Sequence, residues 1–168
     1  MVTATVGSMD EGGRGVAKVG GKVTFIDGAL TGETVIISKR KSKPTFDLAV
    51  TDSVLRSSVF RSKPKCISYD MCGGCCMQHA ELSFQVANKQ RVMEEQFRRI
   101  GEVFPEVIFT PIQGEQWSYR NRARLSARYV KKKGTALVGF RERKSSFVTD
   151  MRSCDVLSKR LSRLIGPL

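Results

Sequence analysis

The sequence lacks any apolar run that approaches the roughly 18 residues of a membrane-spanning helix, and no charged-then-apolar leader opens it. It is also poor in acidic side chains, since 16 Asp and Glu stand against 29 Lys and Arg, a net charge of +13. No basic helix carries the bulky apolar face of a membrane-surface binder. We therefore expect a cytoplasmic monomer with no membrane partner, whose charge favours a polyanion such as RNA.

A nucleotide-binding loop is missing as well. The glycine-containing stretch at residues 10–15 matches neither the G-x-G-x-x-G nor the Walker pattern, and no strand-to-helix context surrounds it. We interpret this stretch as a turn.

Cysteine supplies the clearest motif. Five cysteines are present, and an odd number without a secretory leader does not predict a disulfide framework. Cys66, Cys72 and Cys75 follow a C-x5-C-x2-C spacing, with Gly73 and Gly74 inside the shorter interval. The C-x2-C step brings two sulfur atoms together, and the glycines allow a sharp turn in which backbone N–H groups can donate to sulfur. This spacing predicts a metal site.

A fourth thiolate has to come from elsewhere in the chain. Cys154 is the only cysteine outside this loop, whereas Cys76 is adjacent to Cys75 and points differently, so we expect no ligand role for it. The predicted ligands are Cys66, Cys72, Cys75 and Cys154. Four thiolates suit zinc or an iron–sulfur cluster, and a close trio plus one remote cysteine favours a 4Fe–4S cluster. Gln78 and His79 are candidates for contacts around the metal or to RNA.

The first sixty residues have the pattern of β-strands. Strand-like runs lie at residues 2–6, 15–19, 22–26, 35–39 and 46–50. Gly20 and Gly21 separate two of these runs and predict a two-residue hairpin. Five short strands predict a small closed barrel, because closure removes exposed edges. Arg40 and Lys41 would be exposed between two strands, either contacting nucleic acid or forming a solvated turn.

A helix is expected after the cysteine loop, at residues 81–100, with its apolar stripe in the core. The stripe consists of Leu82, Val86, Met93, Phe97 and Ile100. Residues 107–112 could form a strand. Residues 153–165 predict a second helix that begins near Cys154, and a helix N-terminus would stabilise the thiolate of that residue.

Positive charge is concentrated between residues 118 and 144, which contain ten Lys and Arg but a single acid, Glu142. Residues 119–130 alternate with a period of two and predict a strand with an arginine-lined face. Arginines repeating at about 6.6–6.8 Å along such a face can follow a phosphate backbone, although a solvated or acid-paired face is the alternative. The candidate RNA contacts are Arg120, Arg122, Arg124, Arg128, Lys131, Lys132 and Arg141.

Together these motifs resemble the N-terminal part of the 23S rRNA uracil-5-methyltransferases, relatives of the tRNA uracil-54 methyltransferase. The matching stretches, in order, are residues 13–18, 22–33, 66–79, 119–125, 138–141 and 154–157. The resemblance implies a mainly β (α+β) chain. Residues 1–61 would form a TRAM domain, an OB-like RNA-binding barrel, and residues 62–168 a central α+β domain whose four predicted cysteine ligands hold a 4Fe–4S cluster.

One departure from this family is large. Its members continue into a Rossmann-like domain that binds S-adenosylmethionine and carries the catalytic cysteine and carboxylate, and residues 1–168 hold no such motif. We interpret the chain as the RNA-recognition and iron–sulfur portion, inactive alone, that binds 23S rRNA, with tRNA also possible. The alternative is a freestanding RNA-binding or ribosome-associated module with a structural metal site. A redox or radical protein that uses the cluster as an electron carrier is disfavoured. A radical S-adenosylmethionine site needs C-x3-C-x2-C spacing and one iron atom without a cysteine ligand, whereas the spacing here is C-x5-C-x2-C and four cysteines are available.

Overall fold

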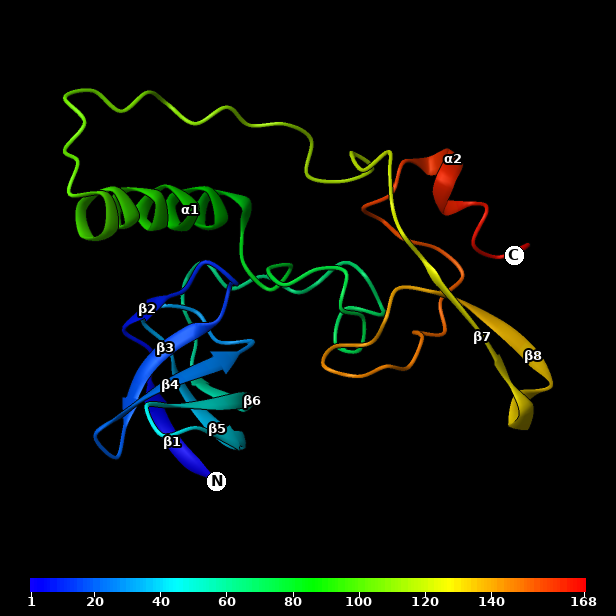
Figure 1. Cartoon of the computed structure of the whole chain (residues 1–168), viewed down its shortest axis with the longest axis horizontal. Coiled ribbons are helices and arrows are strands. Elements are labelled where there is room, and N and C mark those ends of the chain that lie inside the picture. The colour runs from blue at the N-terminus through cyan, green and yellow to red at the C-terminus, as the bar shows by residue number, and fades with distance from the viewer. The chain divides into compact units, whose positions relative to one another are not determined.

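The computed structural model describes all 168 residues, and their contacts divide the chain into two units. The first unit comprises residues 1–63 and 79–111, and the second comprises residues 64–78 and 112–168 (Figure 1). These units differ from the expected segments 1–61 and 62–168, because the long helix after the cysteine loop groups with the N-terminal sheet. None of the helices has the length and apolar character that a membrane span requires.

A mixed six-stranded sheet forms the first unit. Its strands are β1 (Val2–Thr5), β2 (Ser8–Met9), β3 (Gly15–Val19), β4 (Lys22–Asp27), β5 (Thr34–Ser42) and β6 (Phe46–Arg56). They lie in the order β1-β5-β6-β4-β3-β2, and only the β4–β6 pair is parallel. The predicted strand runs are therefore confirmed.

The predicted hairpin between β3 and β4 is also confirmed. It turns at Gly20 and Gly21, whose φ angles are 56° and 80°, as a two-residue turn between twisted strands requires. Residues 10–15 form the expected turn before β3. There the Asp10 carboxylate accepts hydrogen bonds from the backbone N–H of Arg14 at 2.8 Å and from its Nε at 2.7 Å.

The predicted closed barrel is not confirmed, because β1 and β2 lie at opposite ends of the strand order and share no ladder. The residues that join these two strands nevertheless hydrogen-bond to both ends of the strand order, next to β5 and in β3. The N–H of Val6 donates to the carbonyl of Glu33 at 2.9 Å, and the N–H of Gly7 donates to Val16 at 2.9 Å. The sheet encloses a core of Ala4, Val6, Ala17, Ile26, Ala29, Val35, Ile37 and Ala49.

A buried carboxylate ties this sheet to the segment that follows it. Glu33 has no exposed surface, and its two carboxylate oxygens accept hydrogen bonds from Arg61 Nε at 2.5 Å, Arg61 Nη2 at 2.6 Å, Leu30 N at 2.8 Å and Ser58 N at 3.1 Å. Burial alone would raise the pKa of Glu33, but these donors together lower it below its usual value. Glu33 is therefore ionised and paired in the folded chain.

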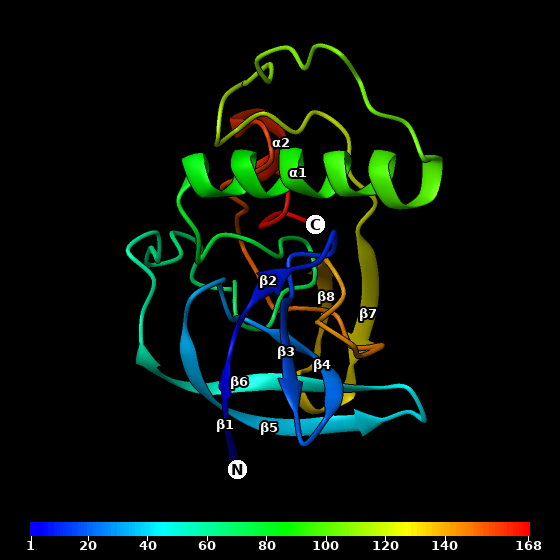
Figure 2. The ribbon, with the colours of Figure 1, turned by 90° about the vertical axis from the view of Figure 1, so that its left-hand side faces the viewer.

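The predicted helix is confirmed as α1 (Leu82–Gln96), which continues as the π-helical segment η1 (Phe97–Gly101). Both views place α1 beside the β2 end of the sheet (Figures 1 and 2). Polar contacts join them, because Arg91 donates to the backbone carbonyl of Met9 and Gln96 donates to Glu11 at 3.1 Å.

The expectation that the apolar stripe of α1 faces the core is wrong for its second half. Met93 and Phe97 are 39% and 40% exposed, and Ile100 is 81% exposed. The buried residue of the helix is instead Asn88, which accepts a hydrogen bond from Arg91 at 3.2 Å. Within the first unit the helix thus makes polar contacts, together with a ring contact between Phe84 and Phe60 at 5.6 Å. Residues 107–112 beyond it do not form the expected strand.

The second unit contains one hairpin and one short helix. Strands β7 (Ser126–Val130) and β8 (Thr135–Gly139) are antiparallel, and the turn η2 (Lys131–Lys133) joins them through Gly134 at φ 64°. The helix α2 (Lys159–Ser162) lies near the C-terminus. The core of this unit consists of Met151, Cys154, Val156, Leu157 and Ile165.

Two expectations for the second unit are corrected. The strand predicted at residues 119–130 exists only from Ser126, because β8 offers five ladder partners and residues 121–125 have none. The backbone of Arg120 bonds to Val156 and Ser158 instead. The C-terminal helix starts at Lys159, so Cys154 does not lie at a helix N-terminus as expected.

Candidate metal centre

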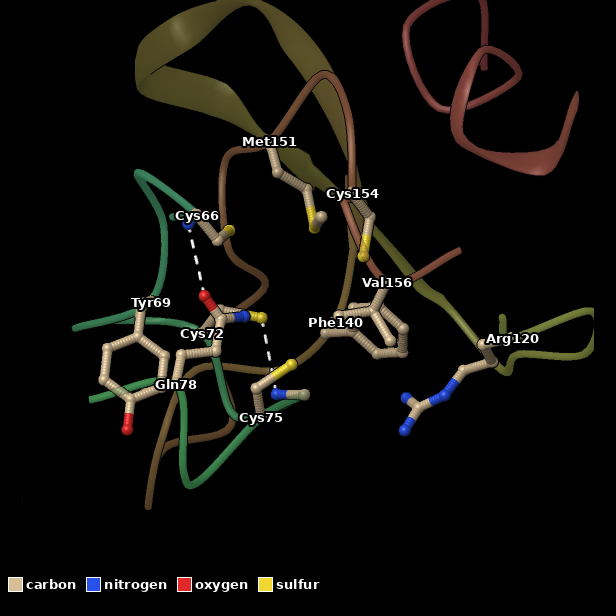
Figure 3. A pocket seen from close by; sticks show the side chains of 11 residues that line it. Cys66, Tyr69, Cys72, Cys75, Gln78, Arg120, Phe140, Met151, Cys154 and Val156 are labelled. Carbon is tan, nitrogen blue, oxygen red and sulfur yellow. Dashed lines mark hydrogen bonds between the residues drawn. The ribbon is translucent and has the colours of Figure 1, made fainter. Parts of the chain in front are cut away.

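Four cysteine side chains line a single cavity of the second unit (Figure 3). Three of them, Cys66, Cys72 and Cys75, come from the loop at residues 64–78, and Cys154 comes from the segment before α2. The other lining residues are Tyr69, Gly74, Gln78, Arg120, Phe140, Met151 and Val156. The structure therefore brings together the three cysteines that the spacing selected and the remote Cys154.

The loop turns sharply at its glycines. The N–H of Gly74 donates to Cys72 Sγ at 3.4 Å, a contact of the kind expected from the sequence. The N–H of Gly73 donates to the carbonyl of Arg141 at 2.9 Å. A Cβ atom at Gly73 would lie only 2.9 Å from that same carbonyl oxygen, so the close backbone approach requires glycine.

Arg143 holds this loop from the segment after β8, and the sequence did not single it out. Its guanidinium donates to the backbone carbonyls of Cys72 at 3.1 Å and Cys75 at 2.7 Å, and it lies 4.4 Å from the centre of the Tyr69 ring. The Tyr69 hydroxyl in turn donates to the carbonyl of Cys76 at 2.7 Å. One arginine thus fixes the backbone at two of the four cysteines.

The protonation of the cysteine thiols depends on whether a metal occupies the cavity. Burial raises the pKa of Cys66 and of Cys75 above the usual thiol value, and the neighbouring cysteines raise both further. For Cys75, a hydrogen bond with Gln78 and the charge of Arg120 oppose this rise only in part. Without a cation these thiols stay protonated at neutral pH, whereas a bound metal deprotonates its thiol ligands outright.

The four thiols form a donor set that suits either of the two metals considered. As the side chains stand, no group of three or more His, Cys, Asp or Glu residues is arranged so that it could hold a metal ion. Zinc binds thiolates at about 2.3 Å in a tetrahedron, which draws four sulfur atoms nearly into contact. A 4Fe–4S cluster is likewise held by four cysteine thiolates.

The remaining predicted residues around the cavity separate into two groups. Gln78 lines the cavity, and its Oε1 accepts a hydrogen bond from the backbone N–H of Cys66 at 3.2 Å. His79 is buried in the first unit and does not line the cavity. Cys76 is exposed and also lies outside the lining.

The basic residues predicted to contact RNA are exposed, with one exception. The exposed residues are Arg40 and Lys41 in the first unit, and Arg122, Arg124, Arg128, Lys131, Lys132 and Arg141 in the second. Arg120 is half-buried and lines the cysteine cavity. The expected row of arginines on one continuous strand is therefore not formed, although Arg122, Arg124 and Arg128 are exposed.

No family model matches the chain, but individual proteins match nearly all of it. It is 53% identical over 165 residues to a Chromobacterium violaceum protein named 23S rRNA (uracil(1939)-C(5))-methyltransferase RlmD, and 49% identical over 161 residues to a protein of the same name from Nitrosospira multiformis. The chain is homologous to part of these RlmD methyltransferases. The resemblance predicted from the motifs is thus confirmed. The matches cover 98% and 96% of this chain, but only 32% and 37% of the RlmD relatives.

A solved structure supports the fold. The Pyrococcus abyssi tRNA (uracil-54, C5)-methyltransferase, in complex with S-adenosyl-L-homocysteine, matches with a TM-score of 0.60 and 24% identity. The match covers 96% of this chain and 34% of that protein. As with the RlmD relatives, the chain corresponds to about a third of a longer protein.

Proposed function

We propose that this chain is the RNA-recognition and iron–sulfur portion of an S-adenosylmethionine-dependent 23S rRNA uracil-5-methyltransferase. The observation that carries the proposal is the meeting of Cys66, Cys72, Cys75 and Cys154 at one cavity, in a chain homologous to RlmD proteins. The curved sheet of the first unit would serve as the TRAM-like, OB-type RNA-binding element. Methyl transfer and binding of S-adenosylmethionine belong to the rest of the parent enzyme, and this portion alone is inactive.

The cluster has a structural role in this proposal. Cys66, Cys72 and Cys75 would hold it from the loop, and Cys154 from the segment before α2. When bound, it supplies metal–thiolate bonds that join these two segments, which are otherwise linked by hydrogen bonds such as those of Arg143. Gly74 and Gln78 assist by donating or accepting hydrogen bonds at the cysteine loop.

The RNA-binding surface proposed for the second unit is the basic hairpin and the segment leading into it. Arg128, Lys131 and Lys132 lie on or next to β7, and Arg122 and Arg124 come just before it, all exposed. Exposed guanidinium groups bind phosphate oxygens, often in pairs of hydrogen bonds. In the first unit, Arg40 and Lys41 project from β5 and could make further phosphate contacts.

Metal analysis of anaerobically purified protein tests the iron–sulfur half of the proposal. We expect about four irons and as many sulfides per chain, with broad absorption near ~400 nm. A colourless protein that holds one zinc ion would contradict the iron–sulfur assignment.

The RNA-binding part of the proposal predicts how the affinity for RNA depends on salt concentration. Replacing Arg122 or Arg124 with alanine should each weaken binding of an rRNA fragment and reduce the slope of log affinity against log salt by about 0.7–0.9, since one phosphate contact is lost. Fluorescence anisotropy over a salt series measures both quantities. Arg160→Ala, an exposed arginine on α2, is the matched control and should leave the slope unchanged. Slopes that stay at the wild-type value in both variants would remove these arginines from the interface.

A further inference from the structure

We propose that Arg120 supplies the counter-charge of the cluster, rather than the phosphate contact that its place in the alternating sequence predicts. This inference rests on the iron–sulfur part of the proposed function. It concerns a residue that the cysteine spacing does not mark, because Arg120 is far from Cys66, Cys72 and Cys75 in the sequence.

The composition of the cavity wall is the first observation. Apart from the four cysteines, the wall consists of one glycine, one amide, one arginine and four mainly apolar side chains. Those four are Tyr69, Phe140, Met151 and Val156. Arg120 is the only residue with a full charge among those that line the cavity (Figure 3). An ionic cofactor in this cavity would thus have one cationic side chain in its wall.

The backbone of Arg120 is the second observation. Its N–H donates to the carbonyl of Val156 at 3.0 Å, and its carbonyl accepts from the N–H of Ser158 at 2.9 Å. These two bonds fix Arg120 against the segment that also carries Cys154. Its neighbours Arg122 and Arg124 have no regular backbone pairing and are exposed, whereas Arg120 is half-buried. The structure therefore separates Arg120 from the other arginines of the row.

The charge of the occupied site explains why an arginine is needed here. Four thiolates outweigh the positive charge of a 4Fe–4S core, so the complex is an anion, and gaining an electron makes it more negative. Burying an anion beside apolar side chains is costly unless a cation compensates it. A fixed positive charge stabilises the reduced state more than the oxidised state, and therefore raises the reduction potential of the cluster. Arginine keeps its charge at any accessible pH.

Two substitutions separate charge from packing. In Arg120→Gln the side chain stays polar but loses its charge, and in Arg120→Lys the charge is kept. We expect Arg120→Gln to disfavour reduction of the cluster at least tenfold, which for one electron is a potential lower by about 59 mV, and Arg120→Lys to stay near wild type. Redox titration of anaerobic protein, followed by electron paramagnetic resonance, measures this shift.

RNA binding supplies the second readout. Because Arg120 faces the cavity, Arg120→Gln should leave the salt slope of RNA binding at the wild-type value, in contrast to Arg122→Ala. An Arg120→Gln protein that keeps wild-type circular dichroism but loses iron that Arg120→Lys retains would support the counter-charge in the same way.

Three results would overturn the inference. An unchanged potential in Arg120→Gln would show that the charge does not act on the cluster, and equal loss of iron in both variants would assign Arg120 a packing role. A reduced salt slope in Arg120→Gln would return it to the RNA interface. Wild-type protein without iron would instead overturn the iron–sulfur proposal itself, and this inference with it, so the two failures are distinguishable.

Discussion

Replacing Cys154 with serine is expected to reduce the iron content of the protein to near zero and to unfold much of the second unit. Cys154 is the only cysteine that lines the cavity from outside the 64–78 loop, so no other thiolate can substitute for it. It is also buried in the core with Met151, Val156 and Leu157. A serine hydroxyl is a poor ligand for iron and places a polar group in this core. Iron analysis and thermal unfolding followed by circular dichroism measure the two effects.

Cys76→Ser is the matched control for this substitution. Cys76 adjoins Cys75, yet it is exposed and does not line the cavity, so its variant should keep wild-type iron content and stability. If Cys76→Ser lost the cluster while Cys154→Ser kept it, the proposed ligand set would be wrong. If both variants lost it, all five thiols would be needed and the four-ligand assignment would fail as well.

The cysteine site could be predicted because its signal is local and its remote member is unique. The C-x5-C-x2-C spacing marks three thiols that one short loop must bring together, and Gly73 allows that loop to approach the carbonyl of Arg141 closely. Cys154 is the only cysteine outside this loop, so the fourth ligand could be predicted without knowing the fold. The residues that hold this loop in place could not be found in the same way. Arg143 is one of ten basic residues between positions 118 and 144, and nothing in its spacing marks its two bonds to the loop.

The strands of the first unit were predicted because alternation and glycine turns are local as well. Periodicity gave wrong predictions where a structure depends on a neighbouring segment of the chain. Residues 119–130 alternate throughout, but a strand forms only where β8 supplies hydrogen-bond partners. The spacing of Met93, Phe97 and Ile100 fits a helix, yet it does not say whether anything covers that face, and in this chain they are exposed. Sequence pattern thus predicts the conformation of a segment better than its neighbours.

The pair formed by Glu33 and Arg61 is a second feature that local patterns do not indicate, and it predicts the other large effect. Arg61→Ala should destabilise the first unit by about 3–5 kcal/mol, because it leaves a buried carboxylate without its cation. Urea unfolding measures this change in the free energy of unfolding. Arg14→Ala is the control. Arg14 pairs with Asp10 at 2.6 Å on a more exposed surface, where an ion pair contributes about 0–1 kcal/mol.

The pH dependence of stability tests the same pair independently. The pKa of Glu33 is lowered in the folded chain from its ordinary value of 4.5, so its contribution is complete above that pH and is lost as the pH falls through the folded value. In Arg61→Ala, burial still opposes ionisation of Glu33, and the hydrogen bonds and charge of Arg61 are gone. The pKa of Glu33 should therefore rise, and the loss of stability at acid pH should become smaller. Adding Glu33→Gln to Arg61→Ala should recover part of the stability, since it removes the unpaired charge. If Arg61→Ala cost no more than Arg14→Ala and left the pH profile unchanged, the pair would not stabilise the fold.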